Sequence, residues 1–155
     1  MTRVEELASQ FDSVTAEALQ ALEASDEAIW QTKSSAEGWT VAALAHHFVS
    51  GLQPISGLLQ GITAGADLPP ITEEMLEQQN LANAKTHAAA AKQDVVALLK
   101  QNAADALSAL RQLTDEDLQR SAQLFGNTVT ADDVAQGILI GHVQNHLESF
   151  KATIG

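Results

Sequence analysis

Two of the chain's five histidines lie four residues apart near its end, in the stretch GHVQNHLESF at 141–150. On one helix, His142 and His146 would project about 40° apart and could reach the same point. A helix offers two imidazoles to one metal ion with this spacing. The pair alone is weak support for a metal site, because most histidine pairs of this spacing are solvated. A third ligand from another helix would strengthen the prediction.

A second histidine pair, in LAHHF at 44–48, supplies candidates for that third ligand. On the helix expected here, His47 lies at the edge of the apolar arc, whereas His46 falls about 160° from its centre. We therefore predict that His47 turns toward the interior and that His46 is a solvent or interface residue. Three protein ligands with one open position are typical of catalytic zinc sites. The alternative for His47 is a lone histidine that is hydrogen-bonded at a helix edge.

The fifth histidine, His87, shares a polar edge with Asn80 and Asn83 on the third predicted helix. This edge runs beside a stripe of apolar and alanine residues, so it could line a pocket. His87 could then support the site or contact a substrate, but we do not predict it to be a metal ligand. The alternative for each of the three residues is an ordinary solvated boundary.

Four segments have the apolar periodicity of amphipathic helices. The third is expected to form one long helix, because residues 71–112 contain neither glycine nor proline. Together they predict one all-α domain over residues 1–155, folded as an antiparallel, up-down four-helix bundle. The predicted helices cover residues 3–26, 41–63, 72–112, and 130 to nearly the C-terminus.

The connections between these helices are marked by capping and turn residues. KSSAEG at 33–38 predicts a loop, and Thr114–Asp117 predicts a short helical turn. FGNT at 125–128 predicts another loop. Thr130 and Asp133 then form a predicted capping box that opens the last helix.

The composition excludes several classes of function. Twenty acidic residues against eight basic ones give a net charge of −12, which argues against nucleic-acid binding and against docking on anionic membranes. The chain has no cysteine, so disulfides, thiolate metal sites and cysteine nucleophiles are impossible. No signal peptide or membrane-spanning run is evident, which predicts a cytoplasmic protein. No histidine follows a glutamate by three residues, unlike the Glu-x-x-His pairs of di-iron bundles.

Two stretches together resemble the DinB/YfiT-like family of four-helix-bundle metalloproteins: GWTVAALAHHF at 38–48 and IGHVQNHLESF at 140–150. In that family a tryptophan opens the second helix and a metal-binding histidine follows eight residues later, as Trp39 and His47 do here. A later HxxxH pair completes the site, here His142 and His146. The resemblance implies a three-histidine site for a divalent metal such as zinc or nickel, and a homodimer.

The resemblance implies an enzyme that acts on a small molecule, most directly a transferase of a low-molecular-weight thiol. Relatives include mycothiol-dependent maleylpyruvate isomerase and bacillithiol S-transferases. Lys85 and Arg111 are candidate anchors for an anionic thiol cofactor. Two alternatives stay open: a metal-dependent hydrolase, and a non-catalytic helical bundle in which the metal is structural or absent.

Overall fold

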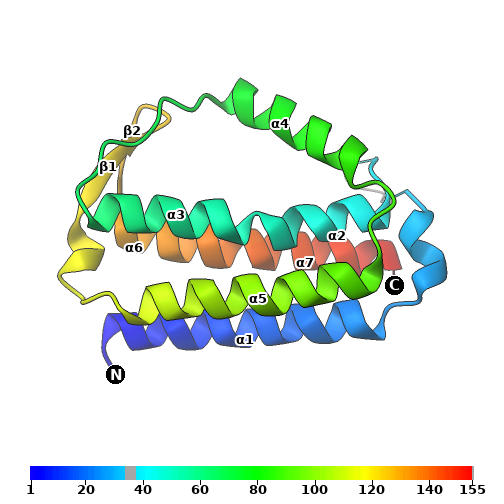
Figure 1. Ribbon diagram of the computed structural model, residues 1–155. Helices are drawn as coiled ribbons and strands as arrows, with labels where there is room; N and C mark the ends of the chain where they lie inside the picture. Colours follow the sequence, from blue (N-terminus) through cyan, green and yellow to red (C-terminus); the bar gives the residue numbers. More distant parts are fainter. Residues whose placement is uncertain (34–37, 155) are drawn as a thin grey trace.

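The computed structural model describes residues 1–33 and 38–154 and forms a bundle of four helical rods (Figure 1). The all-α four-helix-bundle prediction is confirmed. Two of the rods are single α-helices, whereas each of the other two is composed of successive helical segments. The rods are α1 (Arg3–Ala24), α2 (Val41–Ser50) continued by α3 (Leu52–Thr63), α5 (Lys92–Arg111), and α6 (Ala131–Asp133) continued by the π-helical segment η3 (Val134–Ile140) and α7 (Gly141–Ile154).

The direction of each rod follows from contacts at the helix ends. Arg3 Nε lies 2.7 Å from Asp132 Oδ2, so α1 and α6 begin side by side and run parallel. Lys92 Nζ donates to the carbonyls of Glu23 and Ser25 at 2.8 and 2.6 Å, so α5 begins where α1 ends and is antiparallel to it. These contacts close the bundle at opposite ends of α1.

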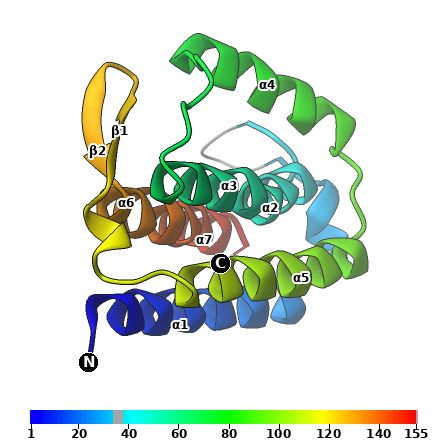
Figure 2. The same ribbon diagram turned by 60° about the vertical axis from the view of Figure 1, so that its left-hand side comes forward.

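The α2–α3 rod runs parallel to α5, so the strictly alternating up-down order predicted from sequence is wrong. Thr40 Oγ1, at the start of α2, donates to Ala88 O just before α5 at 2.7 Å. In the sequence, α4 (Glu73–Thr86) lies between these two rods, and it carries the chain back across α2–α3 to the start of α5 (Figures 1 and 2). The antiparallel packing of α1 on α5 and of α2 on α7 is retained.

The long third helix predicted over residues 72–112 is therefore also wrong. The helix ends at Thr86, a turn follows in which Ala90 N–H donates to His87 O at 3.1 Å, and α5 starts at Lys92. Alanine has the highest helix propensity, so local signals favoured continuity over residues 88–91. Packing overrides that propensity: α5 buries Val95 and Leu99 in the bundle, whereas Ala84 alone is buried in α4.

The second predicted helix is interrupted at Gly51, between α2 and α3. Pro54 supplies a physical reason, because proline has no N–H and its ring conflicts with the carbonyl four residues earlier, that of Ser50. At this joint, Val49 O accepts a 3.0 Å hydrogen bond from the buried Asn102 Nδ2 of α5. The break is thus held by a side chain from another rod.

Short elements connect the rods. The helical turn predicted at 114–117 is confirmed and leads into η2 (Asp117–Gln119). The loop predicted at 125–128 is shorter than expected, because a hairpin of β1 (Ser121–Leu124) and β2 (Asn127–Thr130) surrounds it. Phe125 and Gly126 have φ values of 51° and 80°, as in the tight turns that suit hairpins.

The remaining expectations concern helix ends. The capping box of Thr130 and Asp133 is confirmed. A 3₁₀ helix that was not predicted, η1 (Glu27–Gln31), follows α1 and buries Trp30. The loop predicted at 33–38 falls mainly on residues 34–37, outside the described part of the chain. Within the described ranges, no helix combines the length and apolarity that crossing a bilayer would require.

Candidate metal centre

Three histidines from two rods converge on one small space. His47 comes from α2, and His142 and His146 come from α7, which packs against α2. One ring nitrogen from each lies within 4.8 Å of the other two. The ring centroids are 4.6 Å apart for His47–His146 and for His142–His146, and 5.5 Å apart for His47–His142. The structure therefore brings together the three residues that the sequence singled out.

This donor set fits a divalent metal ion. Zinc binds imidazole nitrogens at about 2.0–2.1 Å, so two nitrogens bound to one tetrahedral ion are about 3.4 Å apart. The three nitrogens lie within 4.8 Å of one another, so a bound ion would draw any two of them together by at most about 1.4 Å. All three histidines are half-buried, and among the described residues the cluster consists of histidines without a carboxylate. Imidazole ligands suit transition-metal ions, whereas hard cations such as calcium prefer oxygen ligands.

Burial keeps two of these imidazoles in the neutral form that binds metal. The pKa of His142 is lowered to about 4, first by desolvation and then by the neighbouring His47, against a hydrogen bond to Phe48 O that raises it. Desolvation also lowers the pKa of His146 to about 3, with contributions from His142 and His47. Both groups are therefore unprotonated near neutral pH without any metal.

Outside the three histidines, an aromatic ring that contacts the site is that of Trp39, just before α2. Its ring packs edge-on against His47, with centroids 5.3 Å apart and planes at 74°. His142 Nε2 lies 2.9 Å from Phe48 O. Trp39, just before α2, thus contacts His47, and Phe48, within α2, contacts His142.

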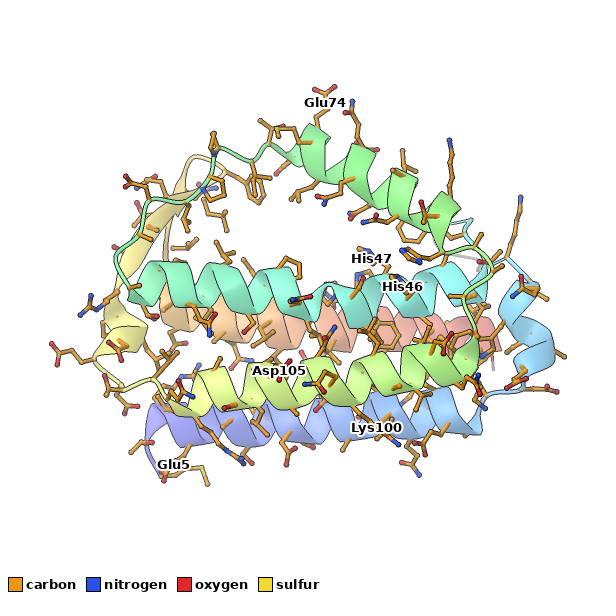
Figure 3. All side chains as sticks on the ribbon, in the orientation of Figure 1. Glu5, His46, His47, Glu74, Lys100 and Asp105 are labelled. Carbon is orange, nitrogen blue, oxygen red and sulfur yellow. The ribbon has the colours of Figure 1, made fainter. Side chains whose placement is uncertain are left out.

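Of the two positions predicted for His46, solvent or interface, the structure shows the interface, because the His46 side chain meets the end of α4. Its ring stacks on His87, with centroids 3.5 Å apart and planes at 14°. The pKa of His46 is lowered by burial first, then by His87 and His47. The angular position of His46 on its helix correctly separated it from the three-histidine cluster. The helix α4 lies over the side of α2 on which His46 and His47 are seen (Figure 3).

The polar edge predicted on the third helix has become the C-terminal half of α4. His87 caps that helix and is half-buried against His46, Asn80 is half-buried, and Asn83 is exposed. Within the described residues, the metal-type cluster contains none of these three. Their role as pocket-lining residues stays a prediction.

Sequence reasoning missed two groups that hold His142, namely Gly51 and the carbonyl of Phe48. A Cβ on Gly51 would lie 2.6 Å from His142 Nε2. Pro54 predicts a break in the preceding helical turn, but it removes the partner of Ser50 O and gives no signal for the contact between His142 and Phe48 O.

We expect the metal-free protein to lose stability as the pH falls from about 6.5 toward 4. In this range His142 and His146 are neutral when folded but titrate near their ordinary pKa of 6.5 when unfolded. The unfolded state then binds more protons, so each histidine contributes at most about 1.4 kcal/mol per pH unit, less where water reaches it. Above pH 6.5 the histidines are neutral in both states, so the stability of the folded protein is not reduced by their titration.

Urea unfolding at pH 7, 6 and 5 measures this loss. The double variant His142→Gln/His146→Gln should show a shallower dependence over the same interval, because neither glutamine titrates. An equally steep dependence in that variant would assign the acid sensitivity to other groups.

Comparison with known proteins places this geometry in a family. The chain matches the DinB superfamily over residues 10–150, whereas no match was found among curated proteins. YfiT from Bacillus subtilis, described as a probable metal-dependent hydrolase with an unusual four-helix bundle topology, is 19% identical with a TM-score of 0.78, and the match covers 99% of this chain and 87% of YfiT.

Two further solved structures have the same fold. Mycothiol-dependent maleylpyruvate isomerase is 18% identical with a TM-score of 0.76; the match covers all of this chain but only 63% of the isomerase. An uncharacterized protein from Clostridium difficile 630 is 12% identical with a TM-score of 0.78, covering 98% of this chain and 95% of that protein. At these identities the structures show the fold alone, whereas the family match spans nearly the whole sequence, and the chain belongs to the DinB superfamily.

Proposed function

We propose that the chain is a metal-dependent enzyme that binds one divalent ion, zinc or nickel, through His47, His142 and His146. The observation that carries this proposal is the convergence of three imidazole nitrogens within 4.8 Å. Three neutral ligands leave the full charge of the ion and one or more open positions. A bound ion of this kind would lower the pKa of a thiol or a water molecule toward neutrality.

The favoured reaction is transfer of a low-molecular-weight thiol to a small electrophile. The fold similarity to the mycothiol-dependent isomerase supports it, although this chain spans 63% of that protein. In this reaction the protein's histidines hold the ion, and the contacts of Trp39 and Phe48 fix two of those histidines in place. The lowered pKa values of His142 and His146 leave both rings free of protons at neutral pH.

An anionic thiol cofactor needs a positive anchor, and Lys85 is the better of the two candidates. Lys85 is exposed in the last turn of α4, two residues before His87, which stacks on His46 beside His47. Arg111 lies at the other end of α5, the end near Asp115 and the start of α1. We therefore assign the anchor role to Lys85 in this proposal.

A hydrolase is the second candidate, supported by the description of YfiT as a probable metal-dependent hydrolase; the match covers 87% of YfiT. The same three histidines would then act on a water molecule instead of a thiol. We further propose a small-molecule substrate and a homodimer, which follow from the family resemblance alone. A non-catalytic bundle with a structural ion is the outcome if no activity depends on the site.

The test starts with metal analysis of the purified protein, followed by activity assays on the zinc- and nickel-loaded forms. Mycothiol, bacillithiol and cysteine serve as thiols, 1-chloro-2,4-dinitrobenzene as the electrophile, and p-nitrophenyl acetate as the hydrolysis substrate. We expect thiol consumption that requires metal and is lost in His47→Ala. Metal-dependent ester hydrolysis without thiol transfer would favour the hydrolase, and rates equal to those of His47→Ala would contradict an enzymatic role.

A further inference from the structure

Gly51, at the joint between α2 and α3, leaves a space that His142 occupies. A Cβ on Gly51 would lie 2.6 Å from His142 Nε2, 2.8 Å from His142 Cε1 and 3.2 Å from His47 O. Contacts below 3.0 Å are essentially never made by real Cβ atoms, so any side chain here would displace the imidazole. The requirement is for space, because the backbone of Gly51 is ordinary right-handed helix, with φ −65° and ψ −19°.

The space lets His142 reach a backbone carbonyl. His142 Nε2 lies 2.9 Å from Phe48 O, and a carbonyl oxygen only accepts, so Nε2 carries the proton and donates. The tautomer assigned from this partner leaves the lone pair on Nδ1. Hydrogen bonds of this kind to a metal-ligating histidine fix its ring orientation and raise its basicity as a ligand.

The carbonyl that receives this bond is itself fixed by the joint. In a continuous helix, Phe48 O and Val49 O would accept from the N–H groups four residues later. Here Val49 O accepts from the buried Asn102 Nδ2 at 3.0 Å, while Phe48 O accepts from His142. Two successive carbonyls at the end of α2 are therefore bound by side chains from α5 and α7.

We infer that Gly51 is a positioning residue for the histidine cluster: its missing side chain seats His142 against Phe48 O and leaves Nδ1 as the nitrogen that faces a metal ion. This inference rests on the proposed metal-binding function, although the seat itself is defined without a metal. It assigns to the interruption of the second helix a direct part in building the site.

The test compares Gly51→Ala with Gly57→Ala, each made with and without His142→Ala. Gly57 is the matched control, since it is an exposed glycine of α3 whose added Cβ would meet nothing within 4 Å. Alanine normally stabilises a right-handed helical position relative to glycine. Gly57→Ala should therefore raise the urea midpoint of the metal-free protein in both backgrounds.

Gly51→Ala should instead lower the urea midpoint when His142 is present and raise it in the His142→Ala background, where the space is vacant. In Co²⁺ titrations followed by visible absorption, Gly51→Ala should weaken binding by about tenfold or more and change the d–d spectrum, whereas Gly57→Ala should change neither. A loss of stability that is equal in both backgrounds, or an unchanged cobalt titration, would overturn the inference.

The two proposals can fail separately. If the unmutated protein bound no Co²⁺ or Zn²⁺, the proposed function would fail, while the midpoint shifts of the metal-free proteins would still report on the seat. If the unmutated protein bound metal and Gly51→Ala bound it equally well, the metal site would stand and the positioning role of Gly51 would be wrong.

Discussion

Replacing His47 by alanine is expected to abolish zinc binding or to weaken it by more than the roughly 10- to 100-fold that loss of an outer hydrogen-bond partner costs. His47 is the cluster's one residue from outside α7, and its ring lies 4.6 Å from that of His146. Without it, two imidazoles on a single helix would hold the ion far less tightly than three. Titration with Zn²⁺ in competition with a chromophoric chelator measures the change.

His46→Ala is the matched control, since it removes the neighbouring imidazole of the same helix. The His46 ring stacks on His87 and lies outside the three-histidine cluster. We expect its zinc affinity to stay nearly unchanged. Equal losses in the two variants would mean that His46 supports the site through its stacking on His87. A loss of zinc affinity confined to His46→Ala would refute the assignment of His47 as a ligand.

Trp30→Ala is expected to lower the free energy of unfolding by about 3–5 kcal/mol, a large part of the stability of a domain of this size. The Trp30 side chain is only 2% exposed. Its ring packs edge-on against Phe150 at 6.3 Å, and its Nε1 donates to Ser25 Oγ at 2.9 Å. Truncation would leave a large cavity between η1 and α7 and remove the donor to Ser25. Urea unfolding of the metal-free protein gives the value.

Phe125→Ala provides the comparison, because Phe125 is an aromatic residue that is 42% exposed at the tip of the hairpin. It also has a positive φ of 51°, so any effect of its truncation is local to that turn. We expect a change within about 0.5 kcal/mol, as for other surface substitutions. Comparable losses in the two variants would contradict the assignment of Trp30 to the core of the bundle.

The histidine cluster could be predicted from sequence because each step depended on local geometry. The spacing of His142 and His146 fixes their relative direction on a helix, and the same arithmetic separates His47 from His46. These arguments need only that each segment be helical near its histidines. Both segments are, since His47 lies within α2 and the pair lies within α7, beyond the π-helical segment.

The path of α4 could not be predicted, because it depends on which surfaces the bundle leaves for burial. The alanines before Lys92 favour helix in any window, so local propensity hid the turn that separates α4 from α5. The consequence reached the site: α4 carries His87 over α2, where it covers His46. His46, predicted to be a solvent or interface residue, is thus a half-buried interface residue through a tertiary contact.

The hairpin and the α2–α3 joint were missed for different reasons. Each strand has only four residues, and the turn places Phe125, a residue that rarely adopts positive φ, before Gly126. At the joint, Pro54 was a readable signal of a break, but nothing in the sequence indicated that His142 would contact Phe48 O. Only the packing of α7 on α2 shows that His142 meets Phe48 O.

The most direct test of the central claim is a crystal structure of the protein loaded with one equivalent of Zn²⁺, with anomalous data collected at the zinc edge. The account predicts one strong anomalous peak, about 2.0–2.1 Å from one ring nitrogen each of His47, His142 and His146. The same data should show Nδ1 as the coordinating atom of His142. The absence of a peak among these three histidines, or a peak that contacts only His142 and His146, would contradict the three-histidine site.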